Sequence, residues 1–242
     1  MRILNLGSGT KTSSHQDVIN IDWSIYLRLR KYRISRLLIP MLANRERLDR
    51  FNALSDNVLA HDLAKGIPFE SETVDAVYHS HFLEHLDRDV ARTFLLEVKR
   101  VLKPGGIHRI VVPDLEGLCR AYLAHFALCE TTLEEASSHD SYVAAIVEQS
   151  VRRESRGVSQ QEPLRRRLEN VLLGDARQRG ETHQWMYDRV NLSVLLVSLG
   201  YRQPVVQRYN TSLLPGWNSY KLDLAESGDE YKPNSLYVEA LK

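Results

Sequence analysis

Two glycines stand one residue apart where the first apolar run of the chain ends, at Gly7 and Gly9. Glycine has no Cβ, so the backbone there can approach a ligand closely, and the amides that follow can bind a polar or anionic group. A second apolar run ends in Asp22, where a carboxylate can accept hydrogen bonds from both hydroxyls of a ribose. The pair therefore indicates a cofactor that contains a nucleoside.

A dinucleotide is the first such cofactor to consider, and two details of the spacing disfavour it. The dinucleotide fingerprint has a third glycine three residues after the second, and this chain has Thr12 there. Asp22 also follows Gly7 by only fifteen residues, fewer than the roughly twenty of a dinucleotide fold. A nicotinamide-dependent oxidoreductase is therefore a disfavoured alternative.

The elements that carry these residues predict an open α/β sheet. Short apolar runs that end in polar residues are typical of buried parallel strands, whose carboxyl ends bind ligands. The expected strands span residues 3–6, 18–21, 58–60, 74–78, 107–112, 205–209 and 235–241. A helix is expected from an N-cap at Asp87 to the Lys-Pro-Gly-Gly sequence of residues 103–106, and another over residues 189–199, after Asp188. This alternation predicts a doubly wound, Rossmann-like fold.

The alternation of strands and helices lapses after the fifth strand. Residues 114–184 contain no strand-like run and predict helices over residues 115–128, 141–152 and 163–173. We therefore expect a core domain of residues 1–112 and 183–242, with a helical insertion over residues 113–182. Residues 11–16 allow barely one helical turn between the first two strands, so one side of the pocket is expected to be partly open or closed by another segment.

Composition excludes several classes of protein. The chain has 242 residues, 43% of them hydrophobic, which excludes disordered and collagen-like proteins. Its formal net charge of +1 gives no reason to expect a nucleic-acid partner. No apolar run approaches the roughly 18 residues of a membrane span. The two cysteines, Cys119 and Cys129, form no CxxC motif, so we expect no metal site and a cytoplasmic location.

Six motifs taken together resemble the class I S-adenosylmethionine-dependent methyltransferases, most closely the type 11 small-molecule group. They lie at residues 4–10, 18–22, 61–63, 68–77, 83–86 and 101–106. The resemblance covers residues 2–112 and resumes weakly from about residue 182. It implies a seven-stranded sheet with an antiparallel last strand and S-adenosyl-L-methionine as cofactor. It also implies methyl transfer to a hydroxyl or amine of a small molecule, such as a glycan or secondary-metabolite intermediate.

The resemblance also implies which residues bind the cofactor. They are Asn5, Gly7, Ser8, Gly9, Asp22, Trp23, Asp62, Leu63, His79 and Ser80. Within this set Asp22 would bind the ribose, Asp62 the adenine, and His79 with Ser80 the methionine part. The chain departs from the family at Asn5, which replaces an acidic residue, and at Lys11, which replaces a glycine. Asn5 and the short connection between the first two strands make a noncatalytic scaffold that keeps the fold an alternative function.

A hydroxyl acceptor calls for a base, and histidine suits proton removal near neutral pH because its ordinary pKa is about 6.5. His81 is the first candidate, followed by His183 and then His85. Each residue has a structural alternative. His81 would line the pocket without titrating, His85 would pack at a helix start, and His183 would belong to a hinge packed by Trp185.

Positive charge gathers in the segments that would cover the acceptor. Residues 28–50 carry a net charge of +6 and residues 152–180 a net charge of +4. We therefore expect an anionic or sugar-containing small-molecule acceptor, with a solvated helical face as the alternative for residues 152–179. Peripheral membrane contact through residues 25–37 is disfavoured by Pro40. Trp217 and Tyr220 are expected either to line the acceptor pocket or to pack within their loop. The oligomeric state stays open.

Overall fold

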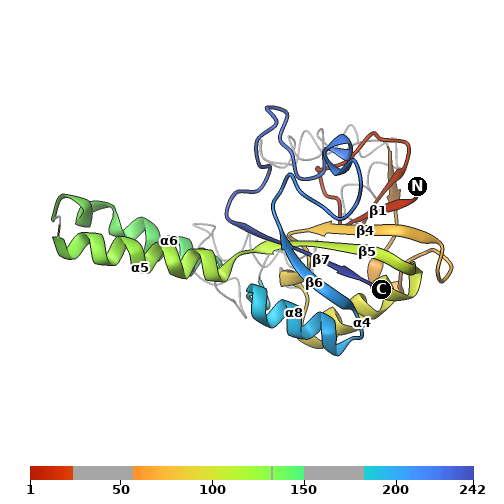
Figure 1. Cartoon of the computed structure of the whole chain (residues 1–242), viewed down its shortest axis with the longest axis horizontal. Helices are drawn as coiled ribbons and strands as arrows, with labels where there is room; N and C mark the ends of the chain where they lie inside the picture. The colour runs from red at the N-terminus through yellow and green to blue at the C-terminus, as the bar shows by residue number, and fades with distance from the viewer. Residues whose placement is uncertain (24–56, 132, 150–182) are drawn as a thin grey trace, which may run out of the picture.

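The computed structural model describes residues 1–23, 57–131, 133–149 and 183–242. Its centre is a seven-stranded sheet with the order β3-β2-β1-β4-β5-β7-β6 (Figure 1). The strands are β1 (Ile3–Leu6), β2 (Val18–Asp22), β3 (Val58–Ala60), β4 (Val74–Ser80), β5 (Leu102–Pro113), β6 (Arg202–Gln207) and β7 (Ser235–Leu241). Only β7 runs antiparallel to its neighbours β5 and β6. This confirms the expected Rossmann-like sheet with an antiparallel last strand.

Four strands, β2, β4, β5 and β6, differ in their bounds from the sequence prediction, and β5 and β6 differ most. β5 begins five residues early, at Leu102, because this residue pairs with Val74 ahead of a register shift in the β4–β5 pairing. β6 begins three residues early, at Arg202, which pairs with Leu241 at the end of β7. β6 is an edge strand with no buried residue, so no apolar run marks its bounds. Pairing with β7 positions it instead.

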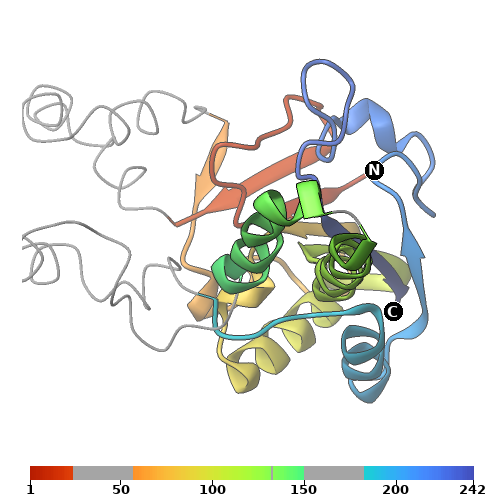
Figure 2. The same cartoon turned by 90° about the vertical axis from the view of Figure 1, so that its left-hand side faces the viewer.

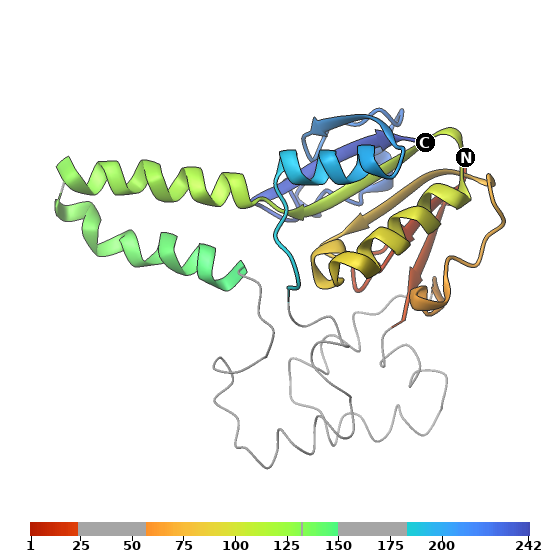
Figure 3. The ribbon, with the colours of Figure 1, turned by 90° about the horizontal axis from the view of Figure 1, so that it is seen from below.

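One face of the sheet is covered by α4 (Arg88–Val101) and α8 (Arg189–Ser198) (Figure 3). In α4 the buried residues recur at helical spacing, from Ala91 through Phe94 and Val98 to Val101. Asp188 caps α8 and its side chain accepts hydrogen bonds from the amides of Val190 and Asn191. Both expected helices are therefore confirmed. The sequence marks α4 by apolar residues at helical spacing and α8 by the N-cap residue Asp188.

The opposite face is covered in the described chain by the loop after β6, which contains the 3-10 helix η4 (Trp217–Tyr220) (Figure 1). Trp217 and Tyr220 are each 5% exposed and pack with Ile3 and Tyr78. They belong to the core, so the packing alternative is confirmed and an acceptor wall of these two rings is wrong.

Two helices follow β5 in the segment that the sequence predicts to be a helical insertion. α5 (Leu115–Thr131), η3 (Leu133–Ser138) and α6 (His139–Gln149) form a hairpin that projects from the sheet (Figures 1 and 2). Its two helices confirm two of the three expected in this segment. The third, over residues 163–173, lies outside the described residues, as do both positively charged segments. No helix in the described part of the chain is long and apolar enough to cross a membrane.

Candidate active site

A cavity of about 200 Å³ opens at the carboxyl ends of β1 and β4. The strand order reverses between these two strands, which is where open α/β sheets bind ligands. Residues 5 and 7–11 line one side of the cavity, and β4 contributes Tyr78 and Ser80. His81, Tyr231 and Lys232 complete the lining. The cavity therefore brings together five of the predicted cofactor residues and the first candidate base.

The glycine loop has the backbone that the sequence predicts for a ligand cradle. Gly7 and Gly9 have φ angles of +62° and +52°, which disfavour other residues. A Cβ on Gly7 would lie 2.5 Å from the Phe82 ring, whereas a Cβ on Gly9 would meet nothing within 4 Å. Ser8 Oγ is buried and makes no hydrogen bond within the described residues. A polar atom buried without a partner at a cavity fits a polar ligand group such as the amino-acid part of the cofactor.

Asn5 has a structural reason to replace the acidic residue of the family. Its side-chain amide donates hydrogen bonds to the Lys11 carbonyl, at 3.0 Å, and to Asn20 Oδ1, at 2.9 Å. Asn20 Oδ1 also accepts a hydrogen bond from the Ser13 amide, at 3.0 Å. A carboxylate cannot donate to these acceptors. Asn5 therefore fixes the short connection between β1 and β2.

His81 and Glu84 form a pair at the edge of the cavity. His81 Nδ1 lies 3.5 Å from Glu84 Oε1, and His81 Nε2 lies 2.8 Å from Ser235 Oγ. Glu84 is 1% exposed, and neither of its carboxyl oxygens makes a hydrogen bond within the described residues. Burial raises the pKa of Glu84 to about 8 and, with the nearby Lys232 charge, lowers the pKa of His81 to about 3. Both side chains are therefore neutral near pH 7.

The other two candidate histidines gather around the same carboxyl group. His85 Nε2 lies 3.9 Å from Glu84 Oε1, and the His85 and His183 rings are 4.8 Å apart. Gln184 and Trp185 donate backbone hydrogen bonds to the Glu84 carbonyl, which holds the His183 segment against this site. No role was predicted for Glu84, although an acidic residue that stands between Leu83 and His85 was the available signal.

His79 does not reach this cavity, contrary to its predicted place beside the methionine part. It is fully buried between Phe82 and Phe94, with Nε2 3.0 Å from His108 Nε2. Alternate residues of a strand face opposite sides, so Ser80 lines the cavity and His79 lies under α4. Burial lowers the pKa of His79 to about 3.

A chain of hydrogen bonds assigns the protons of these core histidines. The Tyr201 hydroxyl donates to the Leu95 carbonyl, at 2.8 Å, so it accepts from His108 Nδ1, at 3.1 Å. His108 Nε2 then accepts from the Nε2–H of His79. The Nδ1 atom of His79 is left as a buried acceptor without a partner among the described residues. These hydrogen-bonded side chains are all neutral and are almost inaccessible to solvent.

The predicted nucleoside-binding residues lie on the same edge of the sheet but outside the cavity. Asp22 ends β2 beside Ala60, the last residue of β3, and Trp23 is 41% exposed. Asp62 Oδ1 accepts a hydrogen bond from Ala64, which caps the 3-10 helix η1 (Leu63–Lys65). A cavity of about 200 Å³ is smaller than the roughly 300–1,000 Å³ of most ligand sites. A cofactor in it would therefore extend toward Asp22 and Asp62, whose roles stay predictions.

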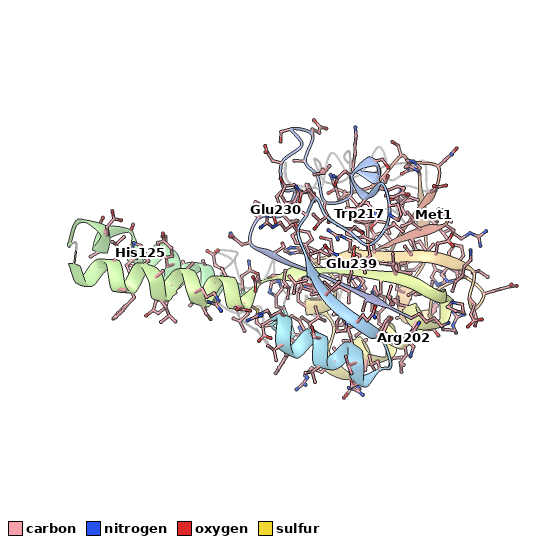
Figure 4. The ribbon with its side chains drawn as sticks, in the orientation of Figure 1. Met1, His125, Arg202, Trp217, Glu230 and Glu239 are labelled. Carbon is pink, nitrogen blue, oxygen red and sulfur yellow. The ribbon has the colours of Figure 1, made fainter. Side chains whose placement is uncertain are left out.

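A buried ionic network supports the cavity from the loop-covered face. Arg109 Nε lies 2.8 Å from Asp223 Oδ2, and Arg109 binds Glu239 Oε1 at 2.7 Å. Asp223 also accepts hydrogen bonds from Tyr78, at 2.8 Å, and from Trp217, at 2.9 Å. The network ties the loop that carries Tyr231 and Lys232 to the sheet (Figure 4 labels Trp217 and Glu239). This network was not predicted from the sequence, although Arg109 and Glu239 interrupt two apolar strands.

Comparison with family models matches residues 34–110 to a methyltransferase domain. The match includes β3, β4 and α4, and begins after the glycine loop. Comparison with curated proteins gives no match.

Among solved structures, the chain is similar to an S-adenosylmethionine-dependent methyltransferase from Archaeoglobus fulgidus, with 14% identity and a TM-score of 0.42. The alignment covers 100% of this chain and 86% of that one. A possible histamine N-methyltransferase from Thermotoga maritima has 16% identity, a TM-score of 0.42, and coverage of 100% and 82%. The family match covers residues 34–110, about a third of the chain, and the likeness to the solved structures is remote. These findings show a match to a methyltransferase domain over the part of the chain that contains β3, β4 and α4.

Proposed function

We propose that the chain transfers a methyl group from S-adenosylmethionine to a hydroxyl or amine of a small-molecule acceptor in the cavity between β1 and β4. The observation that carries this proposal is the His81–Glu84 pair, which stands at the same cavity as the glycine loop. If the carboxyl group of Glu84 releases its proton as the neutral imidazole of His81 takes one up, the product is an ion pair and no isolated buried charge remains.

The main contribution of the protein would be alignment of the acceptor and exclusion of water. The cofactor supplies, when bound, a methyl group on a sulfonium centre that is already a good leaving group. Orientation of the acceptor can contribute roughly 7–11 kcal/mol to the lowering of the barrier. A base adds a factor of about 10² to 10⁴. His81 would take the acceptor proton, and Glu84, 3.5 Å away, would release its own proton to solvent and stabilise the resulting imidazolium as a carboxylate.

Positive charge at the cavity supports an anionic group on the acceptor. Lys11 and Lys232 both line the cavity, and Lys11 Nζ lies 4.2 Å from the centre of the Tyr231 ring. A carboxylate or phosphate of the acceptor would meet these ammonium groups. This support is independent of residues 28–50 and 152–180, whose role as an acceptor lid stays a prediction.

The noncatalytic alternative rested on Asn5 and on the short first connection. Both features have a structural explanation in the hydrogen bonds from Asn5 to Lys11 and Asn20, so neither indicates a lost activity. The catalytic proposal is therefore the one that the site supports better.

A methyl-transfer screen tests the proposal. The chain would be incubated with methyl-labelled S-adenosylmethionine and matched pairs of acceptors, each pair a neutral sugar or alcohol and its carboxylated or phosphorylated form. We expect label in an anionic hydroxyl or amine compound, and far less with the His81→Asn variant. Cofactor binding without transfer to any member of a broad acceptor panel would favour the scaffold.

A further inference from the structure

The α5–α6 hairpin carries a cluster of metal-ligating side chains that methyl transfer does not use. His125 and Cys129 lie on α5, and His139 begins α6. Each contributes one ligand atom to a group whose atoms all lie within 4.8 Å of one another. Figure 4 shows His125 in the projecting hairpin, away from the sheet, and no described residue of the hairpin lines the cavity. The cluster is therefore separate from the candidate active site.

The distances within the cluster suit a tetrahedral ion. His125 Nδ1 lies 3.0 Å from His139 Nδ1 and 3.4 Å from Cys129 Sγ, and the third edge, from Cys129 Sγ to His139 Nδ1, is 4.0 Å. Zinc–nitrogen bonds of about 2.05 Å and a zinc–sulfur bond of about 2.3 Å give tetrahedral edges of about 3.4 and 3.6 Å. The three atoms therefore need only small shifts to share one ion.

The proton on His125 is held on the side away from the cluster. The Ser138 hydroxyl donates to the Glu135 carbonyl, at 2.9 Å, so it accepts from His125 Nε2, at 3.0 Å. His125 Nδ1 is then an unprotonated lone pair that faces Cys129 and His139. Zinc-ligating histidines characteristically donate their other ring N–H to such a partner, which fixes ring and tautomer.

The packing holds the ligands in place before an ion arrives. His125 and Cys129 are four residues apart, so they share one face of α5. His125 is 6% exposed, and the Tyr142 ring stacks on it at 4.1 Å between centroids. The His139 ring lies 5.2 Å from that of Tyr122. Two helices and their aromatic rings thus position one thiol and two imidazoles.

We propose that His125, Cys129 and His139 form a zinc site that fastens α5 to α6, with a water molecule as the fourth ligand. One thiolate and two imidazoles suit Zn²⁺ better than Mg²⁺ or Ca²⁺, which prefer oxygen ligands. Binding forms two Zn–N bonds and one Zn–S bond, releases the thiol proton of Cys129 to solvent, and requires the His139 ring proton, which bridges to His125 Nδ1 at 3.0 Å, to move from Nδ1 to Nε2. Affinity therefore falls as pH falls, because protons compete for the thiolate and both imidazoles.

Cobalt substitution tests this site directly. The full-length chain, without a polyhistidine tag, would be titrated with Co²⁺ and followed by absorption spectroscopy. We expect one equivalent to give the intense visible bands of tetrahedral cobalt and a thiolate-to-metal charge-transfer band, both lost when Zn²⁺ is added. Cys129→Ser should abolish the charge-transfer band, and His139→Gln should weaken binding at least tenfold.

Cys119→Ser is the matched control, because Cys119 is an exposed cysteine on the same helix. It should leave both bands unchanged, and far-ultraviolet circular dichroism should show all three variants folded. Absence of a charge-transfer band in the unaltered chain would overturn the proposal. So would a band that survives Cys129→Ser, or cobalt binding that is lost with Glu84→Gln, which would assign the ion to Glu84, His85 and His183.

Discussion

Polar side chains are buried on both faces of the sheet, as neutral hydrogen-bonded groups on one face and as paired charges on the other. Under α4 and α8, His79, His108 and Tyr201 form a neutral hydrogen-bonded chain. Under the loop after β6, Arg109 is paired with two buried carboxylates, Asp223 and Glu239. Both networks are almost inaccessible to solvent, but only the charged one touches the cavity, through Tyr78.

The comparison shows that a strongly shifted pKa does not by itself mark a catalytic group. Burial lowers the pKa of both His79 and His81 to about 3. His79 is buried in the neutral hydrogen-bonded chain, whereas His81 lines the cavity. What distinguishes His81 is access to the cavity and a neighbouring carboxyl group that makes no hydrogen bond to a described residue. The following changes test this distinction.

Loss of Arg109 should have the largest effect on stability. Arg109→Met leaves Asp223 and Glu239 buried without their cation, which costs about 3–5 kcal/mol of the free energy of unfolding. Urea denaturation would measure the loss. Arg120→Met is the control, because Arg120 pairs with Glu116 on the exposed surface of α5 and should contribute no measurable stability. Equal urea-denaturation midpoints for the two variants would show that the buried network contributes no more stability than the surface ion pair.

Replacement of His81 should act on activity instead. His81 has a φ angle of +49°, which asparagine tolerates better than most residues, so His81→Asn keeps the backbone. We expect kcat to fall by about 10² to 10⁴ and the pH profile to change, with little change in the unfolding midpoint. An unchanged kcat would show that His81 lines the cavity without taking the proton.

A change in the hydrogen-bonded chain of His79, His108 and Tyr201 should lower stability and leave activity nearly unchanged. His108→Leu removes the acceptor for the Nε2–H of His79, and an unmet buried donor costs about 1–3 kcal/mol of stability. Activity measured well below the melting temperature should stay near that of the unaltered chain. A loss of kcat with unchanged stability would place the neutral chain in the catalytic machinery and remove the contrast between the faces.

The smallest effect expected is a pH dependence of stability from Glu84. Its pKa is about 8 in the folded chain against an ordinary value of 4.5, so the folded chain binds more protons between these values. This stabilisation is complete below pH 4.5 and is lost as pH rises through 8. His79 and His81, with lowered pKa values, act oppositely but only below about pH 6.5.

Between pH 6.5 and 8 the unaltered chain should therefore lose up to about 2 kcal/mol that Glu84→Gln does not lose. Urea denaturation at several pH values would measure the difference. Parallel stability curves for the two chains would show that Glu84 ionises at its ordinary pKa.

The sequence predicted the sheet well because its signals are local. Apolar runs located all seven strands, and the cap at Asp188 located α8. The bounds of β6 were wrong because pairing with β7 determines them. In the site, the glycine loop and His81 were predicted from motif positions, and they line one cavity.

The missed parts of the site depend on contacts that are distant in the sequence. His79 and Ser80 are adjacent in the sequence but face opposite sides of β4, and which side faces the cavity depends on how the sheet is covered by the rest of the chain. Arg109 meets Asp223 and Glu239 from residues more than one hundred positions away. No periodic pattern in the sequence predicts an ion pair between residues so far apart in the chain.

Binding of the demethylated cofactor tests the central claim most directly. Calorimetric titration with S-adenosylhomocysteine would compare the unaltered chain with Gly9→Val and Gly105→Val. Both glycines have positive φ angles and open space at the Cβ position, but only Gly9 lines the cavity. The two variants therefore carry similar backbone strain.

We expect one site of equal affinity in the unaltered chain and in Gly105→Val, with affinity at least tenfold weaker in Gly9→Val. No binding to the unaltered chain, or equal affinity in all three, would contradict a cofactor site at the glycine loop.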